Sequence, residues 1–334
     1  MQALKDGDRV LLTPDQNTSF ALAPVVSVVI TTFNSSEWLA RALDSVLEQQ
    51  TNFPIEIVIG DDCSSDATIS IACSYRDLHP DMIRVLQRSE NVGMCRNYYE
   101  TFEQCRGEFI AWLDADDYWT DPEKLAIQVD VLKSDPSINV CGHIVRWVTS
   151  DGVVKRERFP SIPPGRYGVA EIIHHNFLPS CSVMFRNGIH RDLPSWYFNL
   201  APTTDYLIWV LAALSGDLVL LDRVMANYRL TPGSSFTSKG QLFWYQQNAN
   251  FLEQLESVLP VEWHRLIRAE KGKKYESLAY LLRKDGEFVA SREAAIKAFR
   301  SPHLMDNCAS KTKALFAALV REIEWRLWNG LAAR

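Results

Sequence analysis

The sequence predicts an α/β domain, in which helices cover both faces of a largely parallel sheet, followed by an all-helical region. Four short apolar runs alternate with helical patterns before residue 114. Near-continuous apolar strands of this kind are typical of parallel sheets that are buried on both faces. Beyond residue 240 the pattern is that of four or five amphipathic helices without a convincing strand. The expected divisions are a lead-in over residues 1–24, the α/β domain over 25–240 and the helical region over 241–334.

The first half of the domain repeats a unit of strand, loop and helix. The expected strands cover residues 25–30, 55–59, 83–86 and 109–113. The first expected helix carries apolar residues at helical spacing from Trp38 onward, and Asn34 with Glu37 has the spacing of a capping box. Asp121, which precedes Pro122, is expected to cap the helix that follows the fourth strand.

The second half of the domain has a different pattern. Asp151-Gly152 predicts a hairpin turn between two strands. The expected elements are strands at 140–148 and 153–159, a helix at 169–175, a strand at 181–186, a helix at 205–214, and extended runs at 218–221 and 225–228.

The helical region contains one recognisable unit. The residues around Asp285-Gly286 resemble a helical hairpin of the tetratricopeptide type. The last expected helix carries Trp325 and Trp328 among arginines, which favours a helix docked on a core over one lying on a membrane surface.

Polar side chains collect where the expected parallel strands end. TTFN, DDCSSD, ENVG and DADD each follow an apolar run, and ligands of such sheets bind at the carboxyl ends of the strands. In DADD, the carboxylates of Asp114, Asp116 and Asp117 repel one another unless a cation or donor groups absorb their charge. Oxygen ligands suit Mg²⁺ or Mn²⁺, especially when phosphate groups complete the coordination. The pattern therefore favours a metal–phosphate site.

Composition narrows the class of protein. The 334 residues are 47% hydrophobic and 23% charged, which is typical of a globular protein. No apolar run approaches the roughly 20 residues that span a bilayer, and no secretory signal is recognised. Seven cysteines without a CxxC pair indicate reduced thiols and a cytoplasmic location. Residues 1–240 hold 20 basic and 30 acidic side chains, which argues against a nucleic-acid partner.

The motifs together resemble those of family 2 glycosyltransferases over roughly residues 25–230. The resemblance is carried by VSVVITTFNSSEWLARALDSVLEQQ, EIVIGDDCSSDAT, NVG and GEFIAWLDADDYWTDPEKL. It implies the GT-A fold, a Rossmann-like nucleotide-binding mixed sheet flanked by helices, with a DXD-type metal motif that takes Mn²⁺ or Mg²⁺. It also implies inverting transfer from a nucleotide-sugar donor, with a UDP-sugar favoured, to a glycan or lipid-linked acceptor. Bacterial surface polysaccharide and the inner face of the plasma membrane are associations of the family.

The resemblance assigns roles on the donor side. The expected nucleotide-binding residues are Thr31, Phe33, Asn34, Asp61, Asp62, Asn91, Arg96, Asp114 and Ala115. Phe33 is expected to pack on the base, Asp62 or its neighbour Asp61 to accept its N–H groups, and Asp114 to contact the ribose. Asp116 is the expected metal ligand, with Asp117 as the alternative.

On the acceptor side, the resemblance makes Asp205 the general base at the start of a helix. An exposed aspartate titrates near about 3.9, so it is expected to be ionised at neutral pH. Arg186 and Arg229 are candidates for the leaving diphosphate, with structural ion pairs as equal alternatives. Thr231 stands where the family often has a histidine, which leaves the metal with one carboxylate, the diphosphate and water.

Three other functions fit the sequence less well. A sugar-1-phosphate nucleotidyltransferase needs a Gly-rich basic loop after the first strand, and TTFNSSEW contains neither glycine nor lysine. A dinucleotide-dependent oxidoreductase needs GxGxxG at the same place. A non-catalytic sugar-binding or scaffold protein would not require DADD together with Asp205. The C-terminal helices are expected to serve the acceptor, self-association or a membrane surface.

Overall fold

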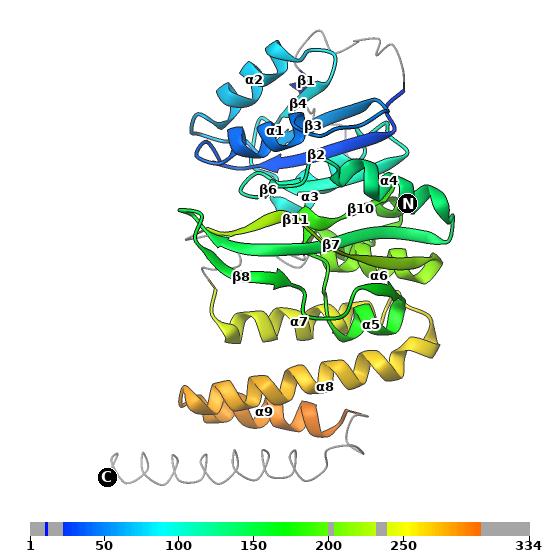
Figure 1. Cartoon of the computed structure of the whole chain (residues 1–334). Helices are drawn as coiled ribbons and strands as arrows, with labels where there is room; N and C mark the ends of the chain where they lie inside the picture. Colours follow the sequence, from blue (N-terminus) through cyan, green and yellow to red (C-terminus); the bar gives the residue numbers. More distant parts are fainter. Residues whose placement is uncertain (1–10, 13–22, 200–203, 232–238, 302–334) are drawn as a thin grey trace. The chain divides into compact units, whose positions relative to one another are not determined.

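The computed structural model describes residues 11–12, 23–199, 204–231 and 239–301. The chain divides into two compact units, residues 1–234 and 235–334. Figure 1 shows a sheet with helices in the first unit, and helices in the described part of the second.

One mixed sheet organises the first unit (Figure 1). Its order is β1-β4-β3-β2-β5-β10-β7-β11-β6, with β8 beside β7 and β9 beside β11. Strands β2 to β5 pair in parallel, as expected, whereas β10 is antiparallel to both β5 and β7. The strands are β1 (Leu11–Leu12), β2 (Val26–Thr32), β3 (Ile55–Asp61), β4 (Ile83–Gln87), β5 (Phe109–Asp114), β6 (Tyr118–Trp119), β7 (Ile138–Thr149), β8 (Val154–Phe159), β9 (Gly165–Tyr167), β10 (Met184–Arg186) and β11 (Asp217–Leu230).

The helices of this unit lie between and around the strands. They are α1 (Leu39–Leu47), α2 (Thr68–Leu78), α3 (Met94–Phe102), α4 (Lys124–Ser134), α5 (Val169–His174) and α6 (Thr204–Ser215), with 3₁₀ turns η1 (Ser180–Ser182), η2 (Ile189–Asp192) and η3 (Ser195–Asn199). The central strands are buried on both faces, because Val28, Val29 and Ile30 are all fully buried. This explains why their sequence shows no alternation of apolar and polar residues.

Neither helix-cap prediction matches the structure. Helix α4 begins at Lys124 and its N-cap residue is Glu123, which makes no side-chain cap hydrogen bond, so Asp121 lies ahead of the cap, where it accepts the backbone N–H of Glu123 at 3.0 Å. The capping box of Asn34 is wrong, because α1 begins only at Leu39. Asn34 instead adopts a left-handed backbone conformation (φ 51°) and accepts the N–H of Ser65 at 2.9 Å.

The predicted hairpin is confirmed. Strands β7 and β8 pair antiparallel across Asp151-Gly152, and Gly152 has the positive φ (84°) that glycine adopts most easily. The two extended runs expected after Gly216 are one strand, β11. Its pairing with β7 shifts register on either side of Val224, so the gap in the sequence pattern marks a bulge rather than a turn.

The second unit is helical where it is described. It contains α7 (Gln241–Leu255), α8 (Val261–Lys284) and α9 (Phe288–Phe299), packed through Ala249, Leu278 and Ala295. Helices α8 and α9 form the expected hairpin around Asp285-Gly286. The expected last helix with Trp325 and Trp328 lies outside the described residues.

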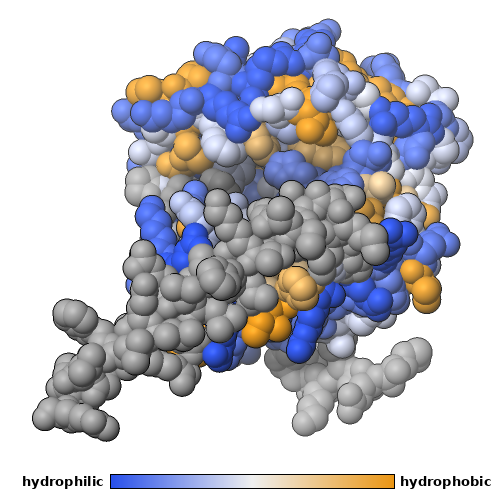
Figure 2. Space-filling model, turned by 90° about the horizontal axis from the view of Figure 1, so that it is seen from below, coloured by the Kyte–Doolittle hydropathy of each residue, from blue (hydrophilic) through white to orange (hydrophobic). Residues whose placement is uncertain are grey.

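Within residues 23–199, 204–231 and 239–301, no helix combines the length and apolar character needed to cross a bilayer. On the face drawn in Figure 2, hydrophobic residues form separate patches among hydrophilic ones.

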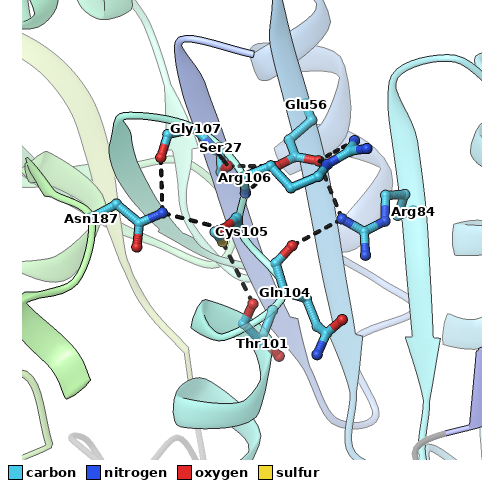
Figure 3. Close-up of polar contacts among 9 residues, drawn as sticks. All are labelled: Ser27, Glu56, Arg84, Thr101, Gln104, Cys105, Arg106, Gly107 and Asn187. Carbon is cyan, nitrogen blue, oxygen red and sulfur yellow. Dashed lines mark hydrogen bonds and ion pairs between the residues drawn. The ribbon is translucent and has the colours of Figure 1, made fainter. Parts of the chain in front are cut away.

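A buried ion cluster holds the amino ends of the parallel strands (Figure 3). Glu56 of β3 is fully buried and accepts hydrogen bonds from Ser27 Oγ (2.6 Å), the Arg106 backbone N–H (2.7 Å) and Arg106 Nη2 (2.6 Å). Arg84 of β4 adds Nη1 at 3.3 Å. Burial raises the pKa of Glu56, but the hydrogen bonds from Arg106 and Ser27 outweigh it and hold the pKa below its ordinary value. The cluster therefore joins β2, β3, β4 and the segment before β5.

Replacing Glu56 by alanine is expected to lower the free energy of unfolding by about 3–5 kcal/mol, because Arg84 and Arg106 lose their shared carboxylate. Urea denaturation measures this change. The control is Glu157→Ala, which removes an exposed ion pair with Arg146 and should cost at most about 1 kcal/mol. Equal losses in the two variants would contradict the prediction.

The same cluster gives a pH dependence. The folded pKa of Glu56 lies below its unfolded value, so its stabilisation is present above the unfolded pKa of about 4.3 and is lost as the pH falls through the folded pKa.

Candidate active site

Strand register brings three of the polar loops to one edge of the sheet. Thr31 of β2 pairs with Gly60 of β3 on one side and with Asp114 of β5 on the other. The residues that follow these positions therefore leave the sheet next to one another. The expectation that TTFN, DDCSSD and DADD share an edge is confirmed by this pairing.

Asp114 is held by donors from three elements. Tyr98 Oη of α3 (2.7 Å) and Trp112 Nε1 of β5 (3.1 Å) both donate to its Oδ1. Ser180 Oγ of η1 donates to its Oδ2 at 2.6 Å. Burial, and then the Asp114 carboxylate, raise the pKa of Tyr98 well above its ordinary value, so the phenol keeps its proton and donates. Asp114 is thus fixed in orientation at the mouth of β5.

Asp116 and Asp117 point to different partners. Asp116 Oδ2 accepts a hydrogen bond from Thr231 Oγ1 at 2.7 Å. Asp117 is buried; its Oδ1 accepts the backbone N–H of Arg229 at 2.7 Å, while its Oδ2 has no N–H or O–H donor. Burial and the neighbouring carboxylates raise the pKa of both side chains, and that of Asp117 most strongly. The corner therefore holds more negative charge than its surroundings neutralise.

The donor set fits a divalent ion only in part. In the described ranges of the chain, no three His, Cys, Asp or Glu side chains are arranged to hold a metal. However, Oδ2 of Asp117 is buried and has no hydrogen-bond partner among the described residues. Together with the Asp116 carboxylate, such an oxygen fits a Mg²⁺ or Mn²⁺ ion that takes most of its ligands from phosphate and water. Thr231 would support Asp116 in this arrangement by its hydrogen bond.

A cationic side chain lies beside the carboxylates. The Arg229 guanidinium carbon is 4.2 Å from the ring centroid of Trp38 and 5.1 Å from that of Tyr118. Arg41 lies over the Tyr118 ring as well, at 5.0 Å. Arg229 Nε is buried and has no hydrogen-bond acceptor. A buried donor without a partner, on a residue next to Asp117 in space, suits an anionic ligand.

Arg186 lies elsewhere and leaves the candidate site. It pairs with Phe109, the first residue of β5, so it sits at the opposite end of that strand from Asp114. Its guanidinium donates to the carbonyl of Leu132 near the end of α4 (2.6 Å) and to that of Ile138 at the start of β7 (2.9 Å). The prediction that Arg186 meets a diphosphate is therefore wrong, and its charge serves the helix terminus.

Asp61 also has a structural task. It is fully buried and accepts hydrogen bonds from Thr32 Oγ1 (2.9 Å) and from the backbone N–H (3.0 Å) and Oγ (2.5 Å) of Ser64. These bonds join the loops after β2 and β3, so Asp61 does not reach a ligand and leaves the predicted nucleotide set.

Asp62 connects two loops. Its Oδ1 and Oδ2 accept the backbone N–H groups of Val92 (2.7 Å) and Gly93 (3.0 Å). Burial raises its pKa despite these bonds. In the same loop, between β4 and α3, Asn91 Oδ1 also accepts the backbone N–H of Gly93 at 3.1 Å.

The other predicted nucleotide residues differ in exposure. Phe33 is half exposed, and so is available to a ligand, whereas the side chain of Ala115 is buried in the core. Arg96 lies on α3 over the ring of Phe198 (5.7 Å) and 3.7 Å from Glu100. Arg96 therefore lies on a face of α3, where its described contacts are with Glu100 and Phe198.

Asp205 stands in the first turn of α6. Asn176 Nδ2 donates to its Oδ2 at 3.3 Å. Trp209 of the same helix packs against Trp112 of β5 at 5.9 Å, which ties α6 to the strand that carries Asp114. Burial, opposed by the Asn176 hydrogen bond and aided by the charge of Asp114, raises the pKa of Asp205 to about 6. The expectation of an exposed aspartate titrating near 3.9 is therefore corrected.

Several site residues had no sequence signal. Ser180 and Asn176 are separated from their partners Asp114 and Asp205 by 66 and 29 positions, so only the fold brings them together. Tyr98 and Trp38 stand in apolar helical patterns, which do not reveal a polar role. His174 and His175 are exposed at the end of α5.

Comparisons with known proteins identify the family of the chain and proteins with a similar fold. Residues 27–193 match the family described as glycosyl transferase family 2. An uncharacterized protein of Mycobacterium tuberculosis is 34% identical over 269 residues, which cover 78% of this chain and 75% of that protein. TarS from S. aureus, solved with UDP-GlcNAc, has a TM-score of 0.55 at 20% identity, covering 91% of this chain and 92% of its own. A mannosyltransferase from Pyrobaculum calidifontis, solved with GDP-Man and Mn²⁺, has a TM-score of 0.57 at 17% identity, covering 97% and 91%.

The Asp205 carboxyl is expected to titrate near pH 6, about two units above an exposed aspartate. Selective ¹³Cγ-aspartate labelling and NMR titration measure this, with the resonance assigned by its loss in Asp205→Asn. The exposed carboxyl of Asp135, held by Ser137 and Arg166, should titrate near 2 in the same spectra. An Asp205 midpoint near 4 would contradict the burial described here.

Proposed function

Because the chain belongs to glycosyl transferase family 2 and is a glycosyltransferase with the GT-A fold, we propose that it moves a sugar from a nucleotide-sugar donor to a hydroxyl of a glycan or lipid-linked glycan, with inversion at the anomeric carbon. The observation that carries this proposal is the pairing of a crowded carboxylate corner with a second carboxylate, Asp205, on a helix packed against the same strand. Donor and acceptor chemistry would then meet between Asp116 and Asp205.

The donor side is assigned to the corner at the end of β5. Asp114 would accept the ribose hydroxyls, since its carboxylate is already oriented by three donors. Arg229, with a buried Nε that lacks an acceptor, would contact the departing diphosphate. Asp116 would hold the metal, with Asp117 as the alternative. When bound, Mn²⁺ or Mg²⁺ supplies positive charge beside the leaving group.

The donor nucleotide is proposed to be UDP, with GDP as the competitor. Asp62 would accept an N–H of either base, because uracil and guanine both present such donors. TarS is described with UDP and with UDP-GlcNAc, and the P. calidifontis enzyme with GDP-Man. A thermal-shift screen of nucleotide sugars with Mn²⁺ distinguishes them, because a ligand that binds the native state raises its apparent stability.

On the acceptor side, Asp205 would take the proton of the attacking hydroxyl. With a pKa of about 6 it is roughly 90% ionised at pH 7, and it is a stronger base than an exposed aspartate. A single displacement follows, in which the acceptor oxygen bonds to the anomeric carbon as the nucleoside diphosphate leaves from the opposite face. Synthesis of a bacterial surface polysaccharide at the cytoplasmic face of the membrane is the proposed setting.

Asp205→Asn is expected to keep nucleotide binding and to lose transfer by at least about 100-fold, because the amide cannot accept the proton. Calorimetry measures binding, and release of nucleoside diphosphate in the presence of acceptor measures transfer. Asp192→Asn, an exposed carboxyl on η2, is the matched control. Transfer at the wild-type rate would remove Asp205 from the role of base.

Asp116→Ala is expected to weaken binding of UDP or GDP at least about tenfold in the presence of Mn²⁺, because the ion loses its protein ligand. A chelator should bring the wild-type protein to the same affinity and leave the variant unchanged. Asp130→Ala, an exposed carboxyl on α4, should bind as the wild type does. Unchanged calorimetric affinity in Asp116→Ala would count against the metal assignment.

A further inference from the structure

Residues 176–180, here called the bridging segment, run between the two candidate carboxylates. The segment begins after α5 and ends at the start of η1. Its first residue, Asn176, donates from Nδ2 to Asp205 Oδ2 at 3.3 Å. Its last residue, Ser180, donates from Oγ to Asp114 Oδ2 at 2.6 Å. Five consecutive residues thus contact both the acceptor-side and the donor-side carboxylate.

The segment between these two contacts is firmly packed. Phe177 and Leu178 are each 1% exposed. The Leu178 carbonyl accepts Trp209 Nε1 of α6 at 3.2 Å, and its N–H donates to Asn176 Oδ1 at 3.2 Å. On the other side, Leu178 packs against Gly142 of β7, where an added Cβ would lie only 2.5 Å from Leu178 Cδ2. The segment therefore acts as a stiff piece between α6 and the sheet.

We infer that Asn176 and Ser180 are positioning residues, which use this stiff segment to hold the proposed general base Asp205 and the nucleotide-side carboxylate Asp114 at a set spacing. The inference rests on the proposed function, because it assigns the two carboxylates to the two substrates. Neither side chain needs to touch a substrate for this role. Asn176 would act on proton transfer through Asp205, and Ser180 on donor binding through Asp114.

The electrostatic surroundings of Asp205 support the part assigned to Asn176. Burial and the charge of Asp114 favour the protonated carboxyl, and the hydrogen bond from Asn176 opposes them. Tyr197 of η3 also faces Asp205, and its own pKa is raised in part by that carboxylate. Removing the Asn176 amide leaves Asp114 and Tyr197 in place, and besides the bond to Asp205 it removes the acceptor of the Leu178 N–H.

The first test titrates Asp205 in the full-length chain, labelled with ¹³Cγ-aspartate, before and after Asn176→Ala. A lost hydrogen bond to a carboxylate is expected to raise its midpoint by about 0.5–1 pH unit. The matched control is Ser182→Ala, since Ser182 Oγ donates to the Pro179 carbonyl and to neither carboxylate. Its Asp205 midpoint should equal that of the wild type.

The second test measures UDP and GDP binding by calorimetry with Mn²⁺. Ser180→Ala is expected to weaken binding of the preferred nucleotide about 3–10-fold, with the Asp205 midpoint unchanged. Asn176→Ala and Ser182→Ala should bind like the wild type. In the transfer assay, Asn176→Ala should lower kcat with little change in the donor KM. The midpoint of the acidic side of its kcat–pH profile should move to higher pH by the same amount as the NMR midpoint of Asp205.

The outcomes separate this inference from the proposed function. If Asp205→Asn abolishes transfer but Asn176→Ala leaves the Asp205 midpoint unchanged, the positioning role of Asn176 is overturned and the base survives. If Ser180→Ala binds nucleotide as Ser182→Ala does, the donor-side half is overturned. If Asp205→Asn transfers at the wild-type rate, Asp205 is not the base and the part of the inference that concerns Asn176 fails with it, while sugar transfer stands. If the wild-type chain transfers no sugar from any nucleotide sugar, the proposed function itself fails.

Discussion

Three aspartates at the carboxyl end of β5 place more negative charge in a partly buried corner than the described side chains offset. Burial and the charge of Asp114 raise the pKa of Asp116, and burial with the charges of Asp116 and Asp114 raises that of Asp117. Arg229 is the nearby cation, and its Nε still lacks an acceptor. The aspartates thus lack positive charge, and the Arg229 donor lacks an anion. A ligand that carries both a metal ion and phosphate oxygens supplies both.

The two ends of the parallel strands differ in this respect. At the amino end, Glu56 is surrounded by Arg84, Arg106 and Ser27, and every partner is supplied by the protein (Figure 3). That cluster can only stabilise the fold. At the carboxyl end, the hydrogen bonds to Asp114, Asp116 and Asp117 do not satisfy every carboxylate oxygen, since Asp117 Oδ2 has no partner among the described residues. The polar groups at the amino end of the sheet are therefore satisfied by the protein and hold the strands together. Those at the carboxyl end are not fully satisfied and are available to a ligand.

Packing connects the carboxyl end of the sheet to the acceptor side. Trp112 of β5 contacts both Tyr98 of α3 and Trp209 of α6, and the bridging segment is bonded to α6 through Leu178. The proposed base is therefore not placed by a mobile loop of its own. It lies on helix α6, which packs against the strand that bears Asp114. This packing suits a reaction that needs two substrates at a defined distance.

Local patterns in the sequence predict the parallel half of the sheet, the β7–β8 hairpin, the α8–α9 hairpin and the acidic corner, because apolar runs, turn residues and adjacent charges are local features. They misplace Asn34 as a helix cap, and they misplace Asp61 and Arg186 at the ligand, since a polar residue near a strand end has the same local pattern whether it meets a ligand or the protein. These cases depend on three-dimensional packing, which also brings Asn176 to Asp205 and Ser180 to Asp114. The fold also sets the pKa of Asp205, because the burial of this carboxyl depends on the residues that pack over the start of α6. No local sequence pattern records those residues.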